Sequence, residues 1–285
     1  MDSPLHEVPD RPWLGAPIDA RPLFAPEHQA LMSTLRALGP DDWRKEAVPG
    51  WTVHDLAAHI LADLYGRLAR DRDGHQGGPA FAPGETVERF VHRINHEWVE
   101  TCRRVSPALL VDTLDLIGPQ HARFIETADP GAPSLGVSWA GADPAPRWLD
   151  SARDFTEYWT HRQQIRHATG RSTDLDAQSL SVVLDTFMRA LPHTLRDTPS
   201  PPGTQVRLTI DGEAGGTWTV TATEERWSLA EPCHGHPAAH VRLDTETAWR
   251  LCTRGIEPDT ALARAHVDGA PGLAETVCRI VSIVH

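Results

Sequence analysis

The hydrophobic pattern of the chain changes near position 200, and this change limits the possible folds more than any other feature. Before the Pro-rich run at residues 196–203, apolar residues recur at the three- and four-residue spacing of helices. After this run, apolar and polar residues alternate, as at Val206, Leu208 and Ile210, which is typical of strands. The sequence therefore predicts an all-helical domain joined by a linker, at about 196–204, to a small α+β domain.

Helices are predicted where an apolar stripe is bounded by residues that start or stop helices. These ranges are 26–38, 52–72, 85–105, 108–127, 147–170 and 176–195, of which 108–127 is the least regular. Residues 129–147, rich in Pro and Gly, are predicted to form a long loop of the kind that borders a site. Residues 1–25 are predicted to form an arm that packs on the surface or stays mobile. We therefore place the helical domain at 26–198 and the α+β domain at 204–285.

The second domain is predicted to contain both strands and helices. Strands are expected at 206–210, 218–222, 239–243 and 263–267, and helices at 245–254 and 272–284. The dipeptides Asp211-Gly212 and Gly215-Gly216 mark the turn between the first two strands. The predicted fold class is therefore α followed by α+β.

The charge balance and the cysteine spacing limit the possible partners and compartment. The chain has 27 Lys and Arg against 39 Asp and Glu, a net charge of −12, which argues against nucleic acid or an anionic membrane as the main partner. No window approaches 18 apolar residues, and the N-terminus has no signal-peptide pattern. The cysteines, at positions 102, 233, 252 and 278, form no C-x-x-C pair. We therefore expect a cytoplasmic protein without a membrane partner.

A carboxylate and an imidazole lie four residues apart in the predicted helix 147–170. Residues at this spacing share one helix face, so Glu157 and His161 project side by side and can chelate one cation. The same spacing also occurs in solvated ion pairs, so spacing alone leaves both interpretations open. The helix is amphipathic, and this pair lies beside its apolar side.

His59 is the second candidate, because it lies on the apolar face of the predicted helix 52–72. A single His in such a place is more often a core residue than a ligand. If this helix faces Glu157 and His161, however, His59 completes a set of two imidazoles and one carboxylate with an open fourth position. That is the arrangement of a catalytic zinc site.

Two other clusters compete for a metal. Glu88, His92 and His96 recur every four residues, but this line is rotated from the apolar stripe of its helix and is interpreted as a solvated face. The run from Cys233 to His236 lies in a Pro/Gly loop without a second Cys pair. The common nucleophile-elbow, phosphate-loop and dinucleotide motifs are absent from the sequence, which removes those enzyme classes.

Several segments together resemble a known family. Residues 38–43 (LGPDDW) and 48–60 (VPGWTVHDLAAHI) are similar to the N-terminal signature of the mycothiol-dependent maleylpyruvate isomerase family, a branch of the DinB-like metal-binding four-helix bundles. Residues 155–171 (FTEYWTHRQQIRHATGR) resemble its second motif. Residues 248–255 (AWRLCTRG) and 267–269 (VDG) are similar to the sterol-carrier-like domain that follows the bundle. The resemblance covers nearly all of the chain after residue 25.

The resemblance implies a ligand set and a co-substrate. The metal ligands of the family fall on His59, Glu157 and His161. The resemblance further implies a divalent metal, usually zinc, and mycothiol, the low-molecular-weight thiol of actinobacteria. Only one of the 27 basic residues, Lys45, is a lysine, and such a bias fits a GC-rich actinobacterial genome. The implied activity is cis–trans isomerisation of maleylpyruvate, or transfer of a thiol to an electrophilic small molecule.

The implied chemistry needs a positive group for the enolate that forms when a thiolate adds to the substrate. Arg166 and Arg254 are the candidates, although each also fits a surface ion pair. The chain has Thr253-Arg254-Gly255 where the resemblance leads us to expect a Gly-Arg pair, and His167 where we expect a small or acidic residue. We expect a monomer or weak dimer. The alternatives are a metal hydrolase or cyclase with His54 or His167 as base, and a binding or sensor module without catalysis.

Three further side chains near these motifs have two interpretations. Asp154 lies one turn before Glu157, where it could orient a ligand His, or could complement the helix dipole. Trp51 and Trp159 are interpreted as packing residues rather than as platforms for a substrate.

Overall fold

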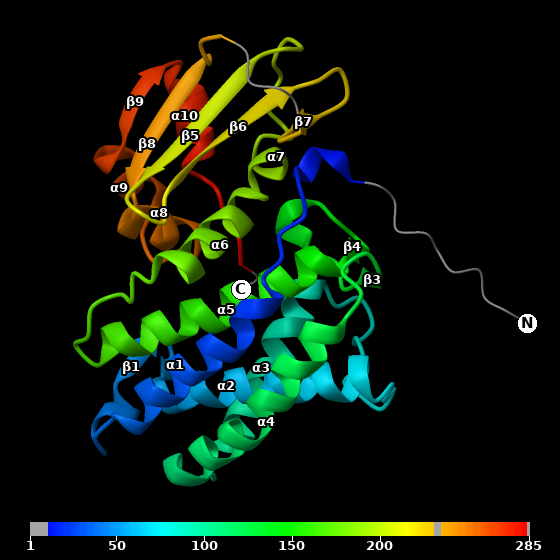
Figure 1. Cartoon of the computed structure of the whole chain (residues 1–285), viewed down its shortest axis with the longest axis vertical. Coiled ribbons are helices and arrows are strands. Elements are labelled where there is room, and N and C mark those ends of the chain that lie inside the picture. Colours follow the sequence, from blue (N-terminus) through cyan, green and yellow to red (C-terminus); the bar gives the residue numbers. More distant parts are fainter. Residues whose placement is uncertain (1–10, 231–234, 284–285) are drawn as a thin grey trace, which may run out of the picture. The chain divides into compact units, whose positions relative to one another are not determined.

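The computed structural model describes residues 11–230 and 235–283, apart from the side chains of residues 87 and 88. The chain forms two compact units. One unit takes the described residues within Met1–Ala20, Asp129–Thr156 and Leu175–Val284, and the other takes Arg21–Ala128 and Glu157–Asp174. They are named the sheet unit and the helical unit. Figure 1 shows the helices and the twisted five-stranded sheet, so the protein has a mixed helical and sheet fold.

The helical unit is built from long helices with buried apolar stripes. Its helices are α1 (Phe24–Arg36), α2 (Val53–Arg67), α3 (Val87–Cys102), α4 (Pro107–Thr127) and, from Glu157 onward, α5 (Arg147–Ala168). Helix α4 packs against α1 and α2, and α2 packs against α3. A π-helical turn, Leu68–Arg72, continues α2, and a 3-10 turn, Arg21–Leu23, leads into α1. These helices confirm five predicted ranges, and the range 108–127, predicted to be the least regular, forms one continuous helix.

A small hairpin precedes α2. Its strands are β1 (Glu46–Val48) and β2 (Trp51–Thr52), after a 3-10 turn at Asp42–Arg44. Gly50 has a φ of 80° in the turn between them, a conformation that glycine adopts without strain. The hairpin turn follows from the Pro-Gly pair in the sequence. It brings Trp51 and the first residue of α2 together.

The sheet unit contains a five-stranded sheet with the order β7-β6-β5-β8-β9. Its strands are β5 (Gln205–Asp211), β6 (Gly216–Ala222), β7 (Trp227–Ser228), β8 (Ala239–Asp244) and β9 (His266–Gly269). Only β5 and β8 are parallel, in register from Val206 opposite Ala239 to Asp211 opposite Asp244. Alternate side chains of these strands are buried, so one face of the sheet meets the core.

Short helices and connections complete the sheet unit. They are α6 (Ala177–Met188), α7 (Leu191–Thr194), α8 (Thr245–Cys252), α9 (Pro258–Arg264), α10 (Pro271–Val277), the strands β3 (Pro133–Ser134) and β4 (Ala145–Pro146), and the 3-10 turns Pro12–Leu14 and Ser138–Ala140. Helix α8 packs against β5 and β8, and α10 packs against β8 and β9. The described part of the predicted arm is packed, because Leu14 and Ile18 are buried.

The predicted boundaries of three elements were wrong. The predicted helix 176–195 is broken between Met188 and Leu191. Residues 263–264 belong to a helix, and the strand predicted over 263–267 begins only at His266. The helix predicted over 272–284 ends at Val277. The structure thus keeps the predicted elements in order, moves these boundaries and adds β1 to β4, β7 and α9, which were not predicted.

No helix in the described ranges 11–230 and 235–283 is long and apolar enough to cross a membrane. The domain limits 26–198 and 204–285 remain a prediction.

Candidate metal centre

Helix α2 places His59 inside the helical unit. The helix begins after Thr52, whose hydroxyl accepts a hydrogen bond from the Asp55 amide while Oδ2 of Asp55 accepts one from the Thr52 amide, at 3.2 and 3.0 Å. This capping box satisfies amides that the first turn leaves without partners. Leu56 and Ile60 then bury the apolar face, and the adjacent His59 is only 7% exposed. The imidazole is thus removed from most of the solvent.

The second part of α5 supplies the other two donors. Glu157 and His161 are one turn apart on this helix, as their spacing predicts. Between and after them, Trp159 and Ile165 are fully buried, so this part of α5 is anchored by its apolar side chains. The side chains of Glu157 and His161 keep 13% and 14% of their surface exposed. The pair therefore lies at the edge of the core, with limited access for a ligand.

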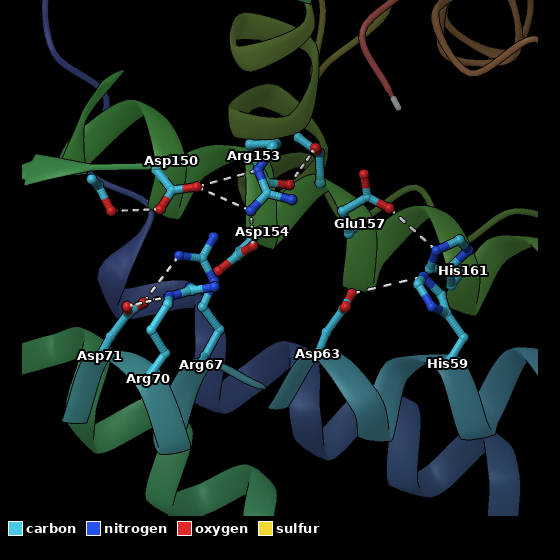
Figure 2. A network of polar contacts seen from close by, with 12 residues as sticks. His59, Asp63, Arg67, Arg70, Asp71, Asp150, Arg153, Asp154, Glu157 and His161 are labelled. Carbon is cyan, nitrogen blue, oxygen red and sulfur yellow. Dashed lines mark hydrogen bonds and ion pairs between the residues drawn. The ribbon is translucent and has the colours of Figure 1, made fainter. Parts of the chain in front are cut away.

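The three donors meet in one place. One ligand atom from each of His59, Glu157 and His161 lies within 4.8 Å of the other two. Nε2 of His161 is 3.2 Å from Oε2 of Glu157, and the two imidazole rings stand nearly perpendicular, at 83°, with centroids 4.9 Å apart. Figure 2 shows His59 reaching up from α2 toward Glu157 and His161. The geometry therefore unites the three residues that the sequence singled out.

Two more side chains border this group. Oδ2 of Asp63, one turn after His59 on α2, lies 3.7 Å from Nε2 of His59 (Figure 2). The indole ring of Trp51 lies against His59, with ring centroids 5.2 Å apart. A second carboxylate adds negative charge beside the imidazoles, and the indole shields one of them.

The histidines differ in their affinity for a proton. Burial lowers the pKa of His59 below its ordinary value, and the nearby Asp63 and Glu157 carboxylates oppose this shift without cancelling it. Burial also disfavours the charged form of His161, but the hydrogen bond and charge of Glu157 outweigh it and raise the pKa of His161. The neutral imidazole of His59 is the form that binds a metal ion.

The donor set fits a divalent transition metal. Zinc accepts imidazole nitrogen and carboxylate oxygen, and two His with one Glu are the protein ligands of a recurring class of catalytic zinc sites. The carboxylates of Glu157 and Asp63 would offset the charge of a dication in this half-buried place. Three ligands leave a tetrahedral ion one position for an exogenous group.

Arg166 and Arg254, predicted to stabilise the reacting substrate, are not among these donors. In the helical unit, Nε of Arg166 donates to the carbonyl of Ser172 at 2.9 Å, which ties the residue to the C-terminal end of α5. In the sheet unit, Arg254 is exposed just after α8, and its φ of 56° lies in the left-handed region. Their roles remain predictions.

The two candidate bases are held elsewhere by hydrogen bonds. Nε2 of His54 is 2.9 Å from the carbonyl of Val105, and Nε2 of His167 is 2.7 Å from Oγ1 of Thr173. Neither belongs to the group of three donors.

The competing clusters find little support in the described residues. His92 and His96 are both exposed, as expected for a solvated helix face, whereas the Glu88 side chain lies outside the described residues. In the other cluster, Cys233 and His234 also lie outside the described residues, and His236 is exposed. In the sheet unit, Asp154 accepts a hydrogen bond from its neighbour Arg153 at 2.6 Å.

Two residues that lie next to the candidate metal donors were not singled out from the sequence. Asp63 lies four residues after His59, and Gln164 lies three residues after His161, with its Oε1 2.8 Å from Nδ1 of that histidine. Helical spacing places both near the candidate donors, but it does not distinguish them from other polar residues one turn away. Trp51 was interpreted as a packing residue, and the structure places its ring against a ligand. Trp159, fully buried, packs in the core.

Comparison with known proteins gives a family for the chain. The sequence matches no curated protein. Two solved structures resemble the chain with low sequence identity. One is mycothiol-dependent maleylpyruvate isomerase, with 14% identity and a TM-score of 0.46. The other is a histidine-to-alanine mutant of that enzyme, with 13% identity and a TM-score of 0.47. Each alignment covers 85% of this chain and 91% of the other. The model of the mycothiol maleylpyruvate isomerase N-terminal domain matches residues 24–166, half of the chain, so the protein belongs to this family.

Proposed function

We propose that the protein is a divalent-metal-dependent, mycothiol-using enzyme that adds a thiolate to an electrophilic small molecule. The observation that carries this proposal is the meeting of His59, Glu157 and His161 within 4.8 Å, on two helices that fall in the matched segment. The family name supports mycothiol as the co-substrate and a maleylpyruvate-type isomerisation as the reaction. A thiol S-transferase would use the same first step.

The three ligands would hold the metal, with zinc as the best match to their chemistry. A bound dication lowers the pKa of a thiol that coordinates it and so supplies a thiolate at neutral pH. His59 and His161 contribute no charge when neutral, and Glu157 contributes one negative charge. The low exposure of the donors restricts water around the reacting sulfur.

In the isomerase reaction, the thiolate adds to a carbon–carbon double bond conjugated with a carbonyl, and the electron pair moves onto the carbonyl oxygen. The resulting carbon–carbon single bond rotates, and the enolate then reforms the carbonyl and the double bond as it expels the thiolate. A transferase would keep the carbon–sulfur bond or expel another leaving group. The enolate requires a positive partner, for which we propose Arg166 or Arg254.

We extend the proposal to the architecture and the setting. The helical unit would correspond to a DinB-like four-helix bundle, which the packing of α1, α2 and α4 supports. The five-stranded sheet and its helices would correspond to the sterol-carrier-like domain. The acidic net charge and the scattered cysteines favour a cytoplasmic monomer or weak dimer.

The first experiment tests the metal site. Zinc content is measured in the purified protein, in His59→Ala and in His96→Ala, a matched control because His96 is exposed on α3. We expect about one zinc per chain in the wild type and control, and a loss in His59→Ala. An unchanged metal content in His59→Ala would refute the site.

The second experiment tests the thiol. Thermal unfolding of the zinc-loaded protein is followed with rising mycothiol, because a ligand that binds the native state raises the melting temperature. No stabilisation at millimolar mycothiol would favour a thiol-independent metal protein, either a hydrolase or cyclase or a sensor. If mycothiol stabilises the protein, incubation with a host extract and mass spectrometry of thiol adducts then identifies the electrophile.

A further inference from the structure

The two nitrogens of His161 have different partners. Nδ1 lies 2.8 Å from Oε1 of Gln164, within hydrogen-bond distance, and Nε2 lies 3.2 Å from Oε2 of Glu157, the neighbouring ligand. An amide oxygen only accepts hydrogen bonds, so the contact with Gln164 requires the proton on Nδ1. When the Glu157 side of the ring faces a metal, the lone pair on Nε2 is then the one available to bind it.

His59 lacks an equivalent contact. Its Nδ1 is buried and has no hydrogen-bond partner among the residues that the structure describes. Its Nε2 lies 3.7 Å from Asp63, which is beyond hydrogen-bond distance. Among the described residues, His161 is therefore held by a hydrogen bond to its Nδ1 and His59 is not.

Gln164 is suited to this task by its place on α5. It follows His161 by three residues, so both side chains lie on the same side of the helix, one turn apart. Its side chain is half-buried, so water competes less for the amide oxygen than it would on the open surface. The amide carries no charge, so it orients the imidazole without changing the net charge of the site.

We propose that Gln164 is a positioning residue of the metal centre: it fixes His161 in the Nδ1–H tautomer and directs Nε2 toward the position shared with Glu157 and His59. The inference rests on the proposed function, because it assigns Gln164 a role toward the same metal. An oxygen acceptor behind a ligand histidine commonly changes metal affinity by about 10–100-fold when removed.

The test compares three variants with the wild type. Gln164→Leu removes the acceptor at similar size, Gln164→Glu keeps an oxygen that can accept from Nδ1–H, and Gln29→Leu changes an exposed glutamine on α1 as a matched control. Zinc affinity is measured by competition with a chromophoric chelator, and the cobalt-substituted proteins are compared by visible absorption. Long-range 15N NMR of the zinc-loaded wild type and Gln164→Leu reports which nitrogen of His161 carries the proton.

We expect Gln164→Leu to lower zinc affinity by about 10–100-fold and to change the cobalt spectrum. Gln164→Glu should stay within about threefold of the wild type, and Gln29→Leu should not differ. In the zinc-loaded wild type, the proton of His161 should be on Nδ1, and in Gln164→Leu this preference should weaken.

Two results would overturn the inference: wild-type zinc affinity in Gln164→Leu, or a wild-type His161 that carries its proton on Nε2. Failure of the proposed function is a separate result, namely a wild-type protein that binds no zinc. If Gln164→Leu fails to fold, the tautomer in the wild type and the zinc affinity of Gln164→Glu still decide the inference.

Discussion

Arg254 occupies a backbone position that favours glycine. Its φ of 56° makes it the non-glycine residue with positive φ in the described part of the chain. The position follows α8, where the Gly255 amide donates to the Arg250 carbonyl at 2.7 Å and closes the helix end. A side chain in the left-handed region costs about 1 kcal/mol, and such strain is often kept where a side chain has a function.

We predict that Arg254→Gly separates stability from activity. The substitution removes the backbone strain, so the free energy of unfolding should stay equal or rise by up to about 1 kcal/mol. If Arg254 stabilises the enolate, isomerase or transferase activity should fall by about 100-fold or more. Urea denaturation and steady-state kinetics measure the two effects. Full activity in a correctly folded Arg254→Gly would exclude this arginine from the chemistry.

At the scale of residues, the sequence pointed to the three candidate metal donors more clearly than to the side chains around them. His59, Glu157 and His161 could be predicted because helical spacing and a family motif both point to them. Asp63 and Gln164 could not be singled out, because polar residues one turn from a ligand are common on any helix. Their significance depends on side-chain distances of 3.7 and 2.8 Å, which spacing does not define.

At the scale of elements, the hydrogen bonds at the start of α2 help to fix the position of His59. Thr52 and Asp55 form the capping box, and Asp55 also accepts hydrogen bonds from Arg103, at 3.0 and 3.2 Å. The cap thus connects the first turn of α2 to the end of α3. A fixed first turn is needed because His59 lies two turns further along the helix.

We predict that Thr52→Ala lowers the free energy of unfolding by about 1 kcal/mol, the usual cost of an N-cap hydroxyl. Thr52→Ser keeps the oxygen and should lose no more than a few tenths of this value. Urea denaturation of the metal-free protein measures both. Equal losses in the two variants would show that the methyl group, rather than the cap, stabilises this turn.

The boundaries that the sequence did not predict have local and tertiary causes. The helix predicted over 176–195 breaks because Pro192 has no amide to donate to the carbonyl of Met188. Near the C-terminus, the amide of Ser282 donates to the carbonyl of Cys252 at 2.8 Å, and the hydroxyl of Ser282 donates to the carbonyl of Phe187 at 2.9 Å. The first cause is visible in the sequence, but the second depends on contacts with distant residues, so the helix ends early without a local signal.

A buried ion pair connects α1 and α5 in the helical unit. Arg162 donates to both carboxylate oxygens of Glu27, at 2.6 and 2.8 Å, and both side chains are only 2% exposed. Asp174 adds a third contact to Arg162 at 2.7 Å. Since Arg162 follows His161 directly, this pair fixes α5 next to the candidate metal donors. Removal of this ion pair should therefore lower the stability of the helical unit.

We predict that Arg162→Met lowers the free energy of unfolding by about 3–5 kcal/mol, because it removes the buried positive charge that faces the Glu27 carboxylate. The double variant with Glu27→Leu should recover at least about 1 kcal/mol of this loss. The control is Arg44→Met, whose partner Asp41 is 92% exposed, and its effect should stay within about 0.5 kcal/mol. A double variant no more stable than Arg162→Met alone would contradict this explanation.

At the scale of the whole molecule, the many histidines make stability depend on pH. The chain has 16 histidines, and burial lowers the pKa of several of them, including His28, His59 and His121. Each such histidine is neutral in the folded protein at a pH where the unfolded chain already binds a proton. Acid therefore favours the unfolded state, and His121 in α4 should contribute strongly because it is only 1% exposed.

The last prediction concerns this acid response. Burial, helped by the charge of Arg67 and opposed by Asp71, lowers the pKa of His121 to about 3, against 6.5 for an ordinary histidine. Between these values only the unfolded state binds this proton, so the free energy of unfolding should fall by about 1.4 kcal/mol per pH unit as the pH drops below about 6.5. His121→Phe, which suits the adjacent rings of Phe24 and Tyr158, should make the decline shallower by up to this amount. Urea denaturation from pH 7.5 to about 4.5 measures the slope, with the exposed His96→Phe as the control that keeps it. Equal slopes in the wild type and His121→Phe would mean that His121 accepts its proton in the folded state.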